Sequence, residues 1–120
     1  MHELSIAQSI LDIIQQHVEQ KDWERVRTVH LKIGTMAGVV PDSLVFSFQV
    51  ITAETPLKQA QLAIESIPFR IQCNACKEVT ESEYAFVQCS KCGSTDTTVL
   101  SGSELNVAEI EIAEPDEGPP

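Results

Sequence analysis

The sequence predicts an α+β fold in which two helices pack on a three-stranded sheet and a cysteine-rich module interrupts the chain. Three observations predict it: two stretches with apolar residues at helical spacing, three stretches that alternate apolar and polar residues, and two closely spaced cysteine pairs before the last of these. We therefore expect an α/β domain formed by residues 1–68 plus 104–113, an inserted module at 69–103, and a disordered acidic and proline-containing tail at 114–120.

The first helix is expected over residues 4–19. Ser5 and Gln8 have the spacing of a capping box, although the helix can equally begin one or two residues earlier. In either case Met1 and His2 project just beyond its amino end. The apolar face recurs at steps of three and four residues at Leu4, Ala7, Leu11, Ile14 and Val18, and it is widened by Ile6, Ile10 and Ile13.

The remaining elements follow from turn residues and alternation. Pro41 fits the first turn of the second helix, and Thr55-Pro56 ends it. Between the helices, Trp23 is expected to fold back on the edge of the core. The expected strands contain Val29, Leu31 and Ile33, then Leu62 to Ile67, then Leu105 to Ala113 with Ala108, Ile110 and Ile112 pointing inward.

All four cysteines lie in two Cys-x-x-Cys units, Cys73 with Cys76 and Cys89 with Cys92. Two residues between thiols let one tight turn aim both sulfurs at one point, and two such turns complete the tetrahedron of a closed structural zinc site. Gly93 suits the left-handed backbone that follows the last cysteine. The pattern thus predicts a zinc-ribbon-like module. Redox dithiols or disulfides, and iron in place of zinc, stay open as alternatives.

Charge and composition exclude several classes of function. With 18 acidic and 8 basic side chains the net charge is −10, which argues against nucleic-acid binding. No apolar run suits a membrane span, and no basic region precedes an apolar stretch at the start, so we expect neither a membrane segment nor a secretory signal. Four thiols at metal spacing fit the cytoplasm. Glu109 and Glu111 are expected on a solvated face, and no nucleophile–base pair indicates an enzyme.

A second metal site is indicated at the first residues. The α-amine of Met1 and the amide and imidazole nitrogens of His2 can bind one ion in two fused chelate rings, and Glu3 can supply a fourth donor. Ni²⁺ and Cu²⁺ promote the loss of the amide proton and prefer such a nitrogen-rich, near-planar site. The alternative is a frayed, solvated His2. His17 and His30 are expected to be structural or solvated.

With both metal features in view, the chain resembles the HypA/HybF family of nickel metallochaperones. The resemblance covers nearly the whole chain. It implies delivery of Ni²⁺ for maturation of [NiFe] hydrogenase, and in some organisms of urease, together with a HypB-type GTPase and docking on the precursor of the hydrogenase large subunit. It rests on Met1-His2-Glu3, the helix behind it, Leu31-Lys32-Ile33-Gly34, Ser43-Leu44, the paired Cys-x-x-Cys units and the closing strand.

The resemblance also implies roles for individual residues. His2 is implied as the nickel ligand, with Glu3 and the Met1 amine in support. The acidic ligand that some relatives place before the second helix aligns with Pro41 here, and Asp42 is adjacent. The implied ligands of structural zinc are Cys73, Cys76, Cys89 and Cys92.

Two other functions share most of these features. One is a zinc-ribbon adaptor that docks on a partner without transferring metal, and the other is a rubredoxin-like electron carrier with iron. The chain is compatible with a monomer or a homodimer, including a homodimer that exchanges the inserted module between chains.

Overall fold

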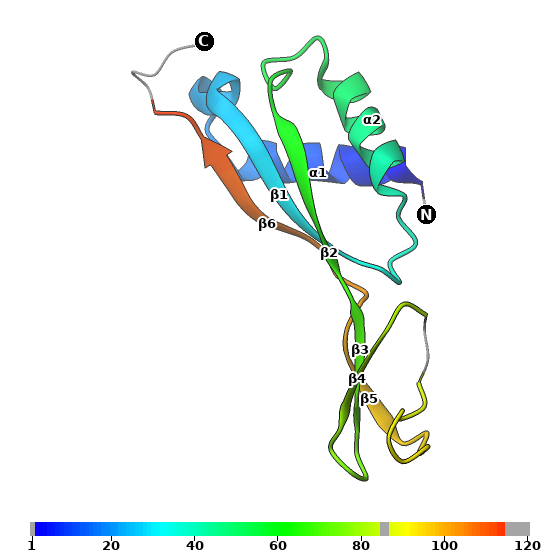
Figure 1. Cartoon of the computed structure of the whole chain (residues 1–120). Helices are drawn as coiled ribbons and strands as arrows, with labels where there is room; N and C mark the ends of the chain where they lie inside the picture. Colours follow the sequence, from blue (N-terminus) through cyan, green and yellow to red (C-terminus); the bar gives the residue numbers. More distant parts are fainter. Residues whose placement is uncertain (1, 85–86, 115–120) are drawn as a thin grey trace. The chain divides into compact units, whose positions relative to one another are not determined.

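A computed structural model of the chain describes residues 2–84 and 87–114, which contain helices and two small sheets (Figure 1). The sheets have three strands each, in the orders β2-β1-β6 and β4-β3-β5. This arrangement confirms the α+β fold class. In chain order the elements are α1 (Glu3–His17), the 3-10 helix η1 (Gln20–Arg25), β1 (Val26–Gly34), α2 (Pro41–Thr52), β2 (Gln61–Ile67), β3 (Phe69–Cys73), β4 (Val79–Ser82), β5 (Thr97–Ser101) and β6 (Leu105–Ile112).

The chain divides into two compact units. The first contains the described residues of 1–31, 39–64 and 107–120, and the second contains those of 32–38 and 65–106. The functional boundaries expected from the sequence stay a prediction. No helix within the described residues has the length and apolar character needed to cross a membrane.

In the first unit, α1 crosses one face of the sheet and packs against α2 (Figure 1). The helix begins at Glu3 rather than at Ser5, because the carbonyl of His2 already accepts a bond from the amide of Ile6 at 3.2 Å. The capping box is therefore wrong, and the earlier start is correct. Leu4, at the helix end, is 56% exposed and does not belong to the buried face. The buried residues of α1 are Ile6, Ala7, Ile10, Leu11 and Ile14.

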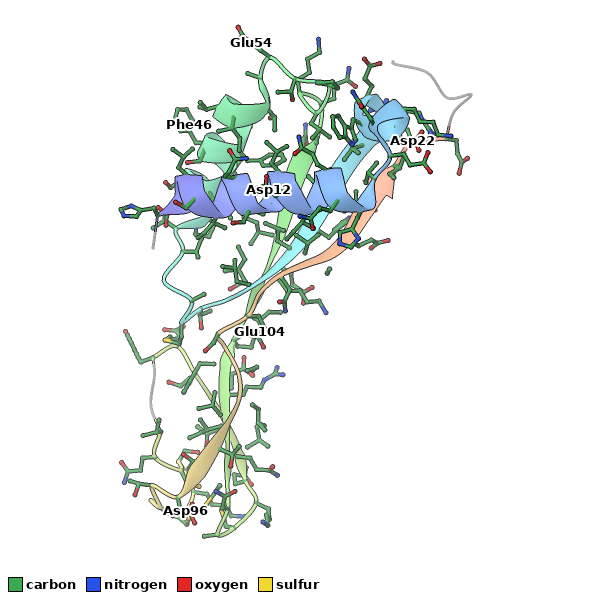
Figure 2. All side chains as sticks on the ribbon, turned by 180° about the vertical axis from the view of Figure 1, so that it is seen from behind. Asp12, Asp22, Phe46, Glu54, Asp96 and Glu104 are labelled. Atoms are coloured by element: carbon green, nitrogen blue, oxygen red, sulfur yellow. The ribbon has the colours of Figure 1, made fainter. Side chains whose placement is uncertain are left out.

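The second helix shows how the apolar face is selected. Leu44 and Phe48 are buried, as their spacing predicts, whereas Phe46 is 66% exposed and lies on the outer side of α2 (Figure 2). The helix ends at Thr52, three residues before the expected end at Thr55. The hydroxyl of Thr52 donates to the carbonyl of Phe48 at 2.8 Å within this last turn.

The sheet confirms one alternation and corrects another. In β1, Val29, Leu31 and Ile33 are all buried. In β6, Ile110 is half-buried, but Ala108 and Ile112 are exposed, so the prediction that both point inward is wrong. The half-buried residues Leu105, Val107 and Ile110 are two and then three residues apart, so the alternation changes phase along this edge strand. Trp23 folds back as expected, and its indole donates to the carbonyl of Val18 at 2.9 Å.

The second unit has a very small core. β3 pairs antiparallel with β4 and with β5, and the pairing with β5 contains an irregularity between Arg70 and Ile71. So short a sheet buries few side chains, and two of the buried residues of this unit are cysteines. A unit of this size needs a stabilising element beyond apolar packing. Its buried apolar residues include Phe69, Ile71, Cys73 and Cys89.

Candidate metal centres

The two Cys-x-x-Cys units fold into the same turn. The amide of Lys77 donates to the carbonyl of Cys73 at 2.9 Å, and the amide of Gly93 donates to the carbonyl of Cys89 at 3.0 Å. The donor residue of each turn has a left-handed backbone, with φ +70° at Lys77 and φ +78° at Gly93. The expectation for Gly93 is confirmed. The equivalent conformation at Lys77 was missed, because lysine gives no sequence signal for it.

The paired turns bring four sulfur atoms together. The Sγ atoms of Cys73 and Cys92 are 3.5 Å apart, those of Cys76 and Cys89 are 3.7 Å apart, and all four lie within 4.8 Å of one another. A tetrahedral zinc ion with Zn–S bonds of about 2.3 Å requires sulfurs about 3.8 Å apart. The cluster therefore fits a structural zinc site without rearrangement of its backbone.

Backbone amides make two of the four thiols more acidic. The amide of Cys76 lies 3.4 Å from the sulfur of Cys73, and it is the main reason why the pKa of Cys73 is lowered to about 6, although burial opposes the shift. The amides of Cys92 and Lys91, each 3.4 Å from the sulfur of Cys89, lower the pKa of Cys89 in the same way. These N–H donors favour the thiolate form that a metal requires.

The pKa values of the other two thiols, Cys76 and Cys92, are raised. At Cys92 the following amide of Ser94 lowers the pKa, but the thiol of Cys73 and burial outweigh it and raise the value to about 11. At Cys76 an amide also lowers the pKa, yet burial and the thiols of Cys89 and Cys73 raise it overall. The raised pKa values of Cys76 and Cys92 thus oppose the ionisation of all four cysteines together. A divalent ion supplies the charge that two protons would otherwise supply.

Polar side chains around the first turn hold it in place. The amide of Asn74 donates to the carbonyl of Asp96 at 2.9 Å, and the side-chain amide of Asn74 donates to the carboxylate of Asp96 at 3.0 Å. The hydroxyl of Thr98 donates to the side-chain oxygen of Asn74 at 3.2 Å. Figure 2 places Asp96 among these loops. The sequence offered no signal for this network, because Asn74 is more than 20 residues away from both of its partners.

His2 lies at the amino end of α1, as expected. It is exposed, has an extended backbone with φ −88° and ψ +118°, and occupies the capping position of the helix. Because the first helical bond runs from Ile6 to the His2 carbonyl, the amide of His2 has no acceptor within the helix. The imidazole and amide of His2 are thus available together. Met1, whose amine was expected to take part, lies outside the described residues.

Glu3 connects the start of the chain to α2. Its carboxylate accepts a bond from the amide of Val40 at 3.3 Å and one from the hydroxyl of Ser43 at 3.5 Å. The Val40 amide is the main reason why the pKa of Glu3 is held below its ordinary value. Asp42 is exposed in the first turn of α2, next to these contacts. Only the fold shows that Glu3 meets Val40 and Ser43, which are 37 and 40 residues away.

The remaining histidines have different surroundings. His17 is exposed at the end of α1, as expected. His30 is half-buried on β1, and its Nε2 lies 3.0 Å from a carboxylate oxygen of Glu111. Glu109 and Glu111 are exposed, as expected. The proximity of His30 to Glu111 was missed, because it depends on the register between β1 and β6.

Comparison with known proteins agrees with these features. The family described as "Hydrogenase/urease nickel incorporation, metallochaperone, hypA" matches residues 1–112. The Hydrogenase maturation factor HypA of Roseiflexus sp. (strain RS-1) is 38% identical over 112 residues, which cover 92% of this chain and 91% of that protein. That of Desulfatibacillum aliphaticivorans is 38% identical over 118 residues, 98% of this chain and 91% of that protein.

A solved structure has the same fold. The solution structure of the Ni metallochaperone HypA from Helicobacter pylori aligns with a TM-score of 0.63 at 23% identity, over 93% of this chain and 97% of that one. The family match extends from the first residue through β6, so it includes both candidate metal centres. The chain therefore belongs to the HypA family of nickel metallochaperones for hydrogenase maturation.

Proposed function

We propose that this chain binds Ni²⁺ through the Met1 amine, the amide and imidazole of His2, and Glu3, and that its four cysteines hold structural zinc. The observation that supports the nickel site best is the position of His2, exposed in an extended conformation just before the first helical hydrogen bond. Its amide can lose a proton to the metal without breaking any helical bond. The ordered helix behind it lowers the entropy lost when the chelate forms.

Glu3 has two roles in this proposal. Its contacts with Val40 and Ser43 position the start of the chain at the amino end of α2. A carboxylate has about four lone-pair sites, so two hydrogen bonds leave room for a metal bond. Asp42 is not needed as a ligand.

The two metal centres have different functions in this proposal. Four thiolates around zinc leave no open coordination position, as expected of a permanent structural ion. A site at the chain terminus with one imidazole exchanges its ion with other ligands readily. We therefore propose a carrier rather than an enzyme, which acts in the cytoplasm, receives or passes Ni²⁺ in cooperation with a HypB-type GTPase, and docks on the precursor of the [NiFe] hydrogenase large subunit.

The test is a nickel titration of the untagged, zinc-loaded protein. A near-planar nickel complex with an amide nitrogen is yellow and diamagnetic, so its absorption band reports this site alone. We expect the band in the wild type, no band in His2→Ala, and an unchanged band in His17→Ala, a matched control in an exposed histidine of the same helix. One residue added before Met1 should weaken the band, because it removes the chelating amine.

Zinc content and helical circular dichroism should be the same in all four proteins. If His2→Ala retains the yellow band, the nickel assignment is wrong. If the wild type has no such band while zinc is bound, the adaptor function without metal transfer is the better description.

A further inference from the structure

Three side chains on neighbouring strands of the first unit converge on one point outside both centres described above. They are His30 of β1 and Glu109 and Glu111 of β6, and β1 and β6 are adjacent in the sheet. The two glutamates are two residues apart on a strand, so they share a face. One ligand atom from each of the three residues lies within 4.8 Å of the others.

The imidazole gives a second, independent observation. The Nε2 atom of His30 has almost no accessible surface and forms no hydrogen bond with any described group. It nevertheless lies 3.0 Å from Oε1 of Glu111. A desolvated ring nitrogen without a hydrogen bond costs free energy, so an additional ligand at this position would be favourable.

The separation of the two atoms suits a shared cation. Two ligands at about 2.1 Å from a metal ion and at right angles to each other are about 3.0 Å apart. A direct ion pair between the half-buried His30 and the exposed Glu111 would contribute little, and it would leave Glu109 without a role. A cation uses all three groups. It also makes the close approach favourable without a proton on Nε2.

We propose that His30, Glu109 and Glu111 bind a divalent first-row transition cation, Ni²⁺ or Zn²⁺, through one imidazole nitrogen and two carboxylates. Imidazole favours these ions over Mg²⁺ and Ca²⁺, and the carboxylates make the site unlike the thiolate centre. Three protein ligands at a partly exposed position leave coordination sites for water. The site is therefore a weak, exchangeable one, and it does not depend on the nickel site proposed at His2.

The experiment uses full-length, zinc-loaded protein that carries His2→Ala, so that the site at the amino end is removed. Ni²⁺ alone is the probe. Six-coordinate nickel is paramagnetic, whereas the near-planar complex at His2 is diamagnetic, so selective broadening of amide NMR signals locates this ion. We expect one exchangeable nickel ion per chain, with broadening centred on His30 and on the strand from Glu109 to Glu111.

Adding Glu109→Gln and Glu111→Gln keeps the shape of the side chains and removes both charges. We expect nickel affinity to fall at least tenfold, on the order of the loss that follows removal of a supporting ligand interaction. Glu65→Gln, an exposed glutamate on β2, is the matched control and should leave the affinity unchanged. Unchanged thermal unfolding of the apo proteins checks that the variants fold.

Three results would overturn the proposal: no exchangeable nickel in the His2→Ala protein, unchanged affinity in the double glutamine variant, or broadening centred elsewhere. None of these depends on the yellow band of the wild type. The two proposals can therefore fail separately.

Discussion

The two equivalent turns of the zinc centre permit a test with opposite outcomes. Gly93 and Lys77 occupy the same position in their turns, and both have a left-handed backbone. Replacing Gly93 with alanine introduces conformational strain into one turn, and replacing Lys77 with glycine removes it from the other. A Cβ at Gly93 would meet only Nε2 of Gln88 at 3.6 Å, an ordinary contact. The effect at Gly93 is therefore conformational and not steric.

The magnitude follows from the left-handed conformation. It costs a residue with a Cβ about 1–2 kcal/mol, and the lower entropy of the unfolded chain without the glycine recovers part of this. The net change is about 1 kcal/mol in each direction. Metal-binding energy in a small zinc unit is folding energy, so the strain is subtracted from zinc affinity. Gly93→Ala should lower the apparent zinc affinity about fivefold, and Lys77→Gly should raise it about fivefold.

Competition with a zinc-binding dye measures both variants. Lys77→Ala is the control, because it removes the ammonium group while it keeps the strained backbone, and its affinity should stay near that of the wild type. If Lys77→Ala raises affinity as much as Lys77→Gly, charge and not backbone strain controls the site. If Gly93→Ala binds zinc as tightly as the wild type, the assignment of strain to this turn is refuted.

Three further predictions concern the second unit. Gly34→Ala should lower the free energy of unfolding by about 3 kcal/mol, because the added Cβ would lie 2.0 Å from the carbonyl oxygen of Gly102. Denaturant unfolding measures this loss. It should be smaller for the control Gly38→Ala, because a Cβ at Gly38 would meet no atom within 4 Å. Removal of zinc by a chelator should speed amide exchange in β3, β4 and β5, and unchanged exchange would contradict a stabilising zinc ion. The lowered pKa of Cys73 favours its thiolate, a contribution that is full above the ordinary value of 9.0 and lost as pH falls through about 6. Because protons also compete with zinc at Cys76 and Cys92, whose pKa values are raised, a dye assay should find zinc affinity falling as pH is lowered from 9 to 6, and an affinity that does not change over this range would contradict the reasoning.

Local patterns were sufficient for most of the secondary structure. Both helices, the three strands of the first sheet and the two cysteine turns follow from spacing that a few neighbouring residues set. The errors lie at boundaries and edges. The start of α1 at Glu3 reflects the low cost of adding one residue to an existing helix. The exposure of Ala108 and Ile112 reflects the change of phase in an edge strand.

The sequence by itself determined the chemistry of the donors: four thiols in two tight turns, and a histidine directly after the first residue. These features are local, since the ligands of each turn are three residues apart. Only the tertiary structure decided which distant groups meet. It brings Glu3 to Val40 and Ser43, and His30 to Glu109 and Glu111, because strand register and helix packing join segments whose separation along the chain carries no pattern.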